Sequence, residues 1–254
     1  MADDAAEERG RGGSQPSAPL ADDAAEERAD DAAEGVRAVL FDFSGTLFRL
    51  DEDDRWFDDM PGVDEEFQAE LMDRLTHPTG SGVAMTERAY HAWVHRDLEP
   101  ALHREAYMHV LQSSGLADPH ARALYQRVID PDAWTPYPDT ADVLNALSGK
   151  GIQTAVVSNI AWDIRSSFTS AGIRADEFVL SFEFGATKPD LRIFQAALDR
   201  LGVDAAEAVM VGDSEENDGA ARELGCGFIL VDPLPTAQRP TGLRDGLREF
   251  GLPL

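Results

Sequence analysis

The hydrophobic pattern divides the chain after residue 35 into short apolar runs and amphipathic segments. The apolar runs are rich in β-branched and aromatic residues and predict buried strands. They cover Arg37–Phe43, Ile152–Ser158, Phe178–Ser181, Glu207–Asp213 and Cys226–Asp232. Helical spacing of apolar residues predicts helices over Asp139–Leu147, Ala161–Ala171, Asp190–Leu201 and Asp218–Leu224. This alternation of strands and helices predicts an α/β fold, a doubly wound parallel sheet with helices on both faces.

Residues 48–134 interrupt this alternation with a long helical stretch. Helices are predicted over Asp64–Leu75, Thr86–Gln112 and Pro119–Ile129, with Gly and Pro clusters between them and no convincing strand. Since one strand precedes the stretch and the others follow it, the pattern predicts an inserted helical domain. The α/β core would then consist of residues 36–47 and 135–254.

The first 35 residues have a different character. The octet ADDAAEER occurs at Ala2–Arg9 and again at Ala21–Arg28, and ADDAAE follows at Ala29–Glu34. The segment has no aromatic or β-branched residue, so it has little apolar area to offset the entropy lost on ordering. Residues 1–35 are therefore predicted to be a disordered acidic repeat tail; an acidic docking arm and a transient helix are the alternatives.

Composition narrows the classes of partner. The formal net charge of −26 repels nucleic acid and anionic membranes, so neither is expected as a partner. No apolar run approaches the ~18–20 residues that cross a bilayer. Cys226 is the only cysteine, which excludes an intrachain disulfide. The acidic start resembles neither a signal peptide nor a basic transit peptide. A cytoplasmic location is expected.

Polar residues follow the predicted strands at the edge where a doubly wound sheet binds ligands. Asp42 closes the first strand, and Ser158 and Asn159 close the second, just before a predicted helix whose N-terminus would favour an anion. Lys188 lies in GATKPD, and Asp213 and Asp218 lie in MVGDSEEND. Paired acids suit Mg²⁺, and a lysine can balance charge on a carboxylate and a transferring phosphoryl group.

Each of these signals also has an ordinary structural explanation. An aspartate or serine after a strand can cap a helix or form a turn, and a lysine is usually a solvated surface residue. Together, however, and in this order, the residues supply a nucleophile, an oxyanion site, a cation and a metal site. Those are the parts that phosphoryl transfer through an aspartyl intermediate requires.

The segments DFSGTL, VVSN, GATKPDLRIF and VGDSEEND resemble the four motifs of the haloacid dehalogenase (HAD) superfamily of hydrolases, over about residues 37–232. The resemblance implies a HAD-like Rossmannoid core with a C1-type cap in the helical insertion. It also implies that Asp42 is the nucleophile and that Ser158 and Lys188 bind the phosphoryl group, with Asn159 as a further contact. Asp42 and Asp213 would bind Mg²⁺, and Asp218 would support the metal through water.

Ser44 departs from the pattern of the family's phosphatases. They usually carry a second aspartate two residues after the nucleophile, which protonates the leaving group and then activates water. A serine does not do this near neutral pH without help, although the Ser44 main-chain carbonyl can still bind Mg²⁺. Three explanations stay open: a leaving group that needs little protonation, an acid supplied by another residue such as one from the cap, or an enzyme that is slow or has a long-lived phospho-aspartate.

The sequence therefore predicts a Mg²⁺-dependent phosphatase that acts on a small phosphorylated metabolite. One alternative is a regulatory module that binds phosphate and Mg²⁺ but is weakened in catalysis, which Ser44 would favour. A metal-independent haloacid dehalogenase is the second alternative. The acids of GDSEEND argue against it, because a site without metal has little reason to hold Asp42, Asp213 and Asp218 together.

Overall fold

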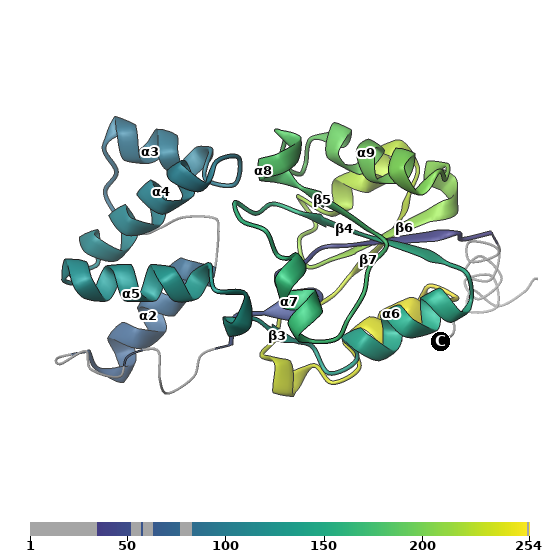
Figure 1. Ribbon diagram of the computed structural model, residues 1–254, viewed down its shortest axis with the longest axis horizontal. Helices are drawn as coiled ribbons and strands as arrows, with labels where there is room; N and C mark the ends of the chain where they lie inside the picture. The colour runs from purple at the N-terminus through teal and green to yellow at the C-terminus, as the bar shows by residue number, and fades with distance from the viewer. Residues whose placement is uncertain (1–34, 52–56, 58–62, 77–82, 253) are drawn as a thin grey trace, which may run out of the picture.

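The computed structural model describes residues 35–51, 57, 63–76, 83–252 and 254 of the 254-residue chain (Figure 1). The predicted acidic repeat tail, apart from Gly35, lies outside the described residues. Within them the chain forms an α/β core and a separate group of helices, hereafter the cap (Figure 1). Among the described residues, no helix combines the length and apolarity that a bilayer crossing requires.

A parallel sheet forms the centre of the core. Within the described residues it has five strands in the order β5-β4-β1-β6-β7, so the first strand lies in the middle. The strands are β1 (Ala38–Phe41), β4 (Gln153–Ser158), β5 (Glu177–Leu180), β6 (Ala208–Gly212) and β7 (Gly227–Leu230). The α/β architecture predicted from the sequence is confirmed.

Helices cover both faces of this sheet, as Figure 1 shows. The described core helices are α6 (Thr140–Gly149), α7 (Arg165–Ser170), α8 (Ser181–Phe184), α9 (Leu191–Leu201) and α10 (Gly242–Glu249). Three 3₁₀ helices accompany them: η3 (Ala205–Glu207), η4 (Gly219–Leu224) and η5 (Thr236–Gln238).

The alternation of side chains along β1 explains why both faces need cover. Val39 and Phe41 pack into a cluster with α6, α7 and α10, whereas Ala38 and Leu40 pack into another with α9 and η4. Successive side chains of a strand point to opposite faces, and all four of these are fully buried. A continuous apolar strand is therefore what a doubly covered sheet requires.

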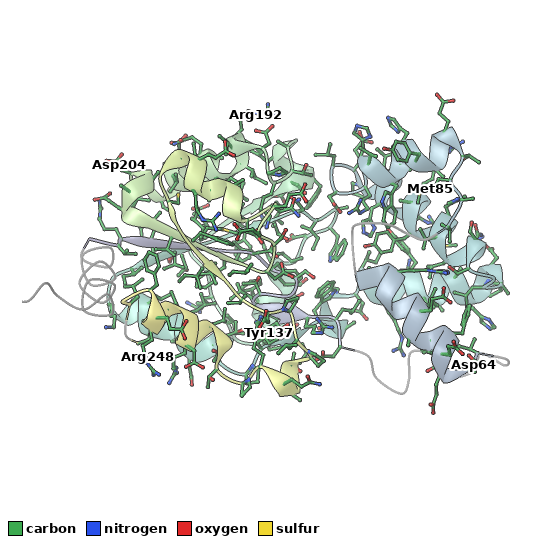
Figure 2. The ribbon with its side chains drawn as sticks, turned by 180° about the vertical axis from the view of Figure 1, so that it is seen from behind. Asp64, Met85, Tyr137, Arg192, Asp204 and Arg248 are labelled. Carbon is green, nitrogen blue, oxygen red and sulfur yellow. The ribbon has the colours of Figure 1, made fainter. Side chains whose placement is uncertain are left out.

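The cap consists of helices between β2 and β3. They are α2 (Glu65–Thr76), α3 (Glu87–Val94), α4 (Pro100–Ser113) and α5 (Asp118–Val128), with the 3₁₀ helix η2 (Pro131–Ala133). Buried Leu111, Leu124 and Tyr125 belong to its main apolar cluster, against which Trp134 at the end of the cap and Trp162 of the core also pack. Figure 2 labels Asp64 and Met85 in the cap and Tyr137 where the chain has returned to the core.

The single helix predicted over Thr86–Gln112 is wrong, because the chain forms α3 and α4 with a turn between them. Proline has no N–H and disfavours helical backbone in the residue before it. Glu99 accordingly has an extended backbone, with φ −144° and ψ 129°, and Pro100 starts the new helix. The turn at residues 95–99 lies on the side of the cap that is directed toward α8 (Figure 1).

Two further predictions need correction. The insertion is not free of strands, since β2 (Phe48–Arg49) pairs antiparallel with β3 (Thr135–Pro136) where the chain enters and leaves the cap. The helix predicted over Ala161–Ala171 is shorter, because α7 begins only at Arg165. Its N-terminus therefore does not follow Ser158 directly, and the helix contribution expected for an anion site there is lost.

Candidate active site

Asp42 continues the central strand into the edge of the sheet where the chain segments converge. Its main-chain N–H donates to the Val211 carbonyl at 2.9 Å, which extends the β1–β6 ladder by one residue. The register pairs Phe41 with Val211 in β6, so Asp213 begins the loop beside Asp42. The Asp42 side chain is buried. A stiff, fully paired strand thus holds the carboxylate in place.

Lys188 connects two of the predicted acids. Its Nζ donates to Asp42 Oδ1 at 2.6 Å and to Asp218 Oδ1 at 2.5 Å. The lysine side chain is only 3% exposed. Burial works against its charged form, but the charges of Asp218 and Asp42 outweigh burial and raise the pKa of Lys188. The lysine is therefore an ammonium that is fixed against the nucleophile candidate.

Asn159 holds the segment that carries this lysine. Its Oδ1 accepts from the Lys188 N–H at 2.7 Å, and its Nδ2 donates to the Lys188 carbonyl at 2.9 Å. The side chain expected to contact phosphate thus binds the Lys188 main chain. Ser158, just before it, ends β4, is 2% exposed and pairs in register with Leu180 of β5.

Asp42, Asp213 and Asp218 form the acidic cluster. One ligand oxygen from each lies within 4.8 Å of the others. Two glycines make this approach possible. A Cβ on Gly212 would lie 2.2 Å from the Asp218 carboxylate, and a Cβ on Gly45 would lie 2.2 Å from Asp213 Oδ2. The Ser214 N–H also fixes Asp218, by donating to its Oδ2 at 3.0 Å.

The electrostatics of the acidic cluster favour a bound cation. Burial is the largest cause that raises the pKa of Asp42 to about 7; Lys188 opposes it, and Asp218 and Asp213 add to it. Burial also raises the pKa of Asp213 to about 6, again with help from Asp218. One ammonium thus faces three carboxylates. Since Mg²⁺ prefers a few carboxylate oxygens, the donor set and its excess of negative charge fit this ion.

Ser44 is placed two residues beyond Asp42 and is exposed. Its main chain forms an isolated bridge with Phe48, and the Gly45 N–H donates to the Phe48 carbonyl at 2.8 Å. These contacts fold the loop back toward β2. The predicted metal contact through the Ser44 carbonyl stays a prediction.

Arg239 is a residue that sequence reasoning missed. It is buried and donates to the carbonyls of Gly45, at 2.6 Å, and of Thr46. Its guanidinium carbon lies 3.2 Å from the ring centroid of Tyr137. The arginine therefore ties the loop after Asp42 to the C-terminal segment. No motif marks it in the sequence, because it lies beyond the last predicted strand.

The cap also reaches this edge of the sheet through Asp97, which sequence reasoning did not single out. Ser181, the first residue of α8, donates its hydroxyl to the Asp97 carbonyl at 2.5 Å. The charge of Lys188 acts on the Asp97 carboxyl. The main chain of a cap residue therefore lies beside the ends of β4 and β5, close to the residues at the strand ends.

A family model described as "Hydrolase: haloacid dehalogenase-like hydrolase" matches residues 36–225. The chain belongs to the haloacid dehalogenase-like hydrolases. This membership confirms the resemblance drawn from the four motifs, and the match covers both the first strand and the cap.

Two relatives share parts of the sequence. "Haloacid dehalogenase-like hydrolase domain-containing protein 3" of Mus musculus is 33% identical over 147 residues, which are 54% of this chain and 59% of the relative. "Glyceraldehyde 3-phosphate phosphatase" of Methanothermobacter thermautotrophicus is 37% identical over 117 residues, which are 44% of this chain and 52% of the relative. The matches thus span little more than half of these relatives' lengths.

Solved structures support the fold. The L-2-haloacid dehalogenase from Xanthobacter autotrophicus matches with a TM-score of 0.57 and 24% identity, over 83% of each chain. Identity at this level shows a common architecture and carries no argument about the reaction.

Proposed function

We propose that this hydrolase is a Mg²⁺-dependent phosphatase that acts on a small phosphorylated metabolite through a phosphorylated Asp42. The observation that carries the proposal is the bond from Lys188 Nζ to Asp42 Oδ1, at the border of the acidic cluster. One carboxylate is thereby held on a rigid strand between an ammonium and a set of metal-type oxygen donors. Similarity to a glyceraldehyde 3-phosphate phosphatase supports a phosphoryl substrate.

The proposed first step forms an acyl phosphate. An oxygen of the Asp42 carboxylate attacks phosphorus, and the bond between phosphorus and the leaving-group oxygen breaks. The leaving oxygen takes up a proton. Lys188 balances the charge on the phosphoryl oxygens, and Asn159 keeps its main chain in place. When bound at Asp42 and Asp213, with Asp218 in support, Mg²⁺ would supply further positive charge beside the phosphoryl group.

The second step restores the enzyme. Water loses a proton as it attacks the phosphorus of phospho-Asp42, and the bond between phosphorus and the Asp42 oxygen breaks. Inorganic phosphate leaves, and the carboxylate is regenerated. Covalent catalysis of this kind divides one difficult displacement into two easier ones.

Phosphate release from an aryl phosphate, with Mg²⁺ and with a chelator, tests the proposal. We expect Asp42→Asn to lower kcat/KM by at least ~10⁴-fold, or about 5.5 kcal/mol, because the amide is a poor nucleophile. Asp199→Asn, which changes an exposed carboxylate of α9, is the matched control and should behave like the wild type. A chelator should abolish wild-type turnover.

Other outcomes would favour the two alternatives. Equal background hydrolysis by the wild type and Asp42→Asn, together with Mg²⁺ binding measured by calorimetry, would leave the weakened regulatory module. Release of chloride or fluoride from 2-haloacids without metal would indicate a dehalogenase. The acidic cluster weighs against that reaction, because a direct displacement of halide has no use for three converging carboxylates.

A further inference from the structure

The proposed phosphatase, on which this inference rests, needs a proton donor for its leaving group. Ser44 is exposed and is an alcohol, which does not act as a general acid or base near neutral pH without help. Asp42, Asp213 and Asp218 serve the phosphoryl group and the metal in the proposed mechanism. For a substrate whose leaving group needs a proton, the acid would therefore come from another residue that reaches the edge of the sheet.

The turn at residues 95–99 is docked on that edge. The Asp97 carbonyl accepts the Ser181 hydroxyl at 2.5 Å, and the same hydroxyl oxygen accepts the Ile160 N–H at 2.9 Å. Ser181 is fully buried and follows Leu180, which pairs with Ser158. The main chain of Asp97 is thus anchored where β4 and β5 end.

The Asp97 carboxyl lies within electrostatic reach of the cation that binds the nucleophile candidate. The charge of Lys188 acts on it, and Lys188 Nζ lies 2.6 Å from Asp42 Oδ1. Arg96 Nε lies 3.7 Å from Asp97 Oδ2, and the side chain of Asp97 keeps 20% exposure. The carboxyl is therefore partly open to solvent and is coupled by charge to the lysine of the candidate site.

Charged and titratable groups around Asp97 come from three elements. Arg96 lies in the same turn, Tyr107 lies on α4, and Lys188 precedes α9. Burial outweighs the two cations and raises the pKa of Asp97. A carboxyl of this kind holds a proton more readily than a solvated one, as a general acid requires.

Neighbouring groups are less suited to the role. Burial and Arg96 lower the pKa of His103 to about 3, so this imidazole is neutral and gives no proton. Burial raises the pKa of Tyr107 to about 12, which makes it reluctant to release one. The guanidinium carbon of Arg96 lies 4.5 Å from the ring centroid of Trp93, and Arg96 donates to the Trp93 carbonyl at 2.7 Å. Arg96 therefore stabilises the turn.

We propose that Asp97, supplied by the cap, is the general acid and base of the reaction. Its carboxyl donates a proton to the leaving-group oxygen as the bond to phosphorus breaks. The resulting carboxylate takes a proton from the water that attacks phospho-Asp42, which returns Asp97 to its starting form. Phosphate esters with basic leaving groups are the substrates that depend on this step.

A series of aryl phosphates, from 2,4-dinitrophenyl phosphate to unsubstituted phenyl phosphate, tests the role. We expect Asp97→Asn to lower kcat/KM for phenyl phosphate by about 10²-fold or more, and for dinitrophenyl phosphate by less than ~3-fold, because a good leaving group departs without a proton. Glu99→Gln is the matched control. It removes an exposed carboxylate of the same turn that makes no side-chain capping bond.

Rescue separates catalysis from packing. Ser44→Asp in the Asp97→Asn background places a carboxyl two residues after the nucleophile and should restore phenyl phosphate hydrolysis at least ~10-fold. If Asp97→Asn fails to fold, Asp97→Glu replaces it. We expect Asp97→Glu to retain the wild-type dependence of kcat/KM on the leaving group, whereas an equal loss for all leaving groups would overturn the proposal.

The failures of the two proposals look different. Equal losses for all leaving groups in Asp97→Asn, or no loss at all, overturn the role of Asp97 alone. Absence of any turnover that depends on Asp42 in the wild type overturns the proposed phosphatase and this inference together.

Discussion

The acidic cluster and the cap turn at residues 95–99 reach the same edge of the sheet but are held there differently. Asp42 and Asp213 directly follow paired, buried strands, so the ladder of the sheet sets their separation. The cap turn is joined to this edge through the bond between Ser181 and the Asp97 carbonyl. A ring contact also joins the cap to the core, since the ring centroids of His103 on α4 and Trp162 of the core lie 5.0 Å apart.

This difference separates two tasks. The groups proposed to bind phosphorus and metal need positions that vary little, and a parallel sheet with two covered faces provides them. Asp97, which is proposed to protonate the leaving group, comes from a helical insertion whose sequence can change without disturbing the hydrogen bonds of the sheet. We infer that the core sets the reaction and the cap sets which leaving groups it serves.

Among the changes to the core, removal of the Lys188 ammonium should lower activity the most. In Lys188→Met, Asp42 and Asp218 lose their shared ammonium, and we expect kcat/KM to fall by about 10²–10³-fold. Lys150→Met is the matched control, because Lys150 is exposed and is the only other lysine. Similar activities in the two variants would mean that the core edge does not depend on this cation.

A smaller effect is expected from crowding of the acidic cluster. In Gly212→Ala the new Cβ would meet the Asp218 carboxylate at 2.2 Å, so Asp218 must move. We expect Mg²⁺ affinity, measured by calorimetry, to fall by about 10–100-fold. Gly149→Ala is the control, since a Cβ there meets nothing within 4 Å. Unchanged affinity in Gly212→Ala would show that Asp218 does not support the metal.

A buried histidine of the cap should contribute to the pH dependence of the free energy of unfolding. His103 is 1% exposed, and burial lowers its pKa to about 3. Below pH ~6.5, His103 binds a proton in the unfolded chain but stays neutral in the folded chain. The free energy of unfolding therefore falls as pH decreases. Between pH 7 and pH 5 this loss is roughly 2 kcal/mol.

Denaturant unfolding of His103→Gln at several pH values measures this contribution. The variant should lack the loss, whatever its absolute stability at pH 7, and its activity at pH 7 should change little. His120→Gln, which alters a partly exposed histidine of α5, should keep the wild-type dependence. A His103→Gln protein with the wild-type slope would show that His103 is not buried in its neutral form.

Most of the core was predictable because its signals are local. A run such as AVLF needs only its own composition to indicate a buried strand, and the residue after it then lies at the edge of the sheet. The order Asp42, Lys188, Asp213 and Asp218 was enough to predict that these side chains converge, and the structure brings them together. Their catalytic roles stay proposals.

The cap was less predictable because its apolar spacing continues across the boundary between two helices. Apolar spacing continues through residues 86–112, but α3 ends at Val94 and α4 begins at Pro100, and the turn between them carries Asp97. The β2–β3 pair has two residues in each strand, which is too short for a periodic signal. Its partners meet only because the cap begins and ends at the same place.

The amino-acid sequence by itself determined the alternation of strands and helices and the chemistry at the strand ends, because both arise between neighbouring residues. Only the tertiary structure decided which distant groups serve that chemistry. Asn159 binds the Lys188 main chain from 29 residues away, Ser181 binds the Asp97 carbonyl across 84, and Arg239 binds the Gly45 carbonyl across 194. Contacts over such separations depend on how the whole chain packs, and no local pattern of residues encodes them.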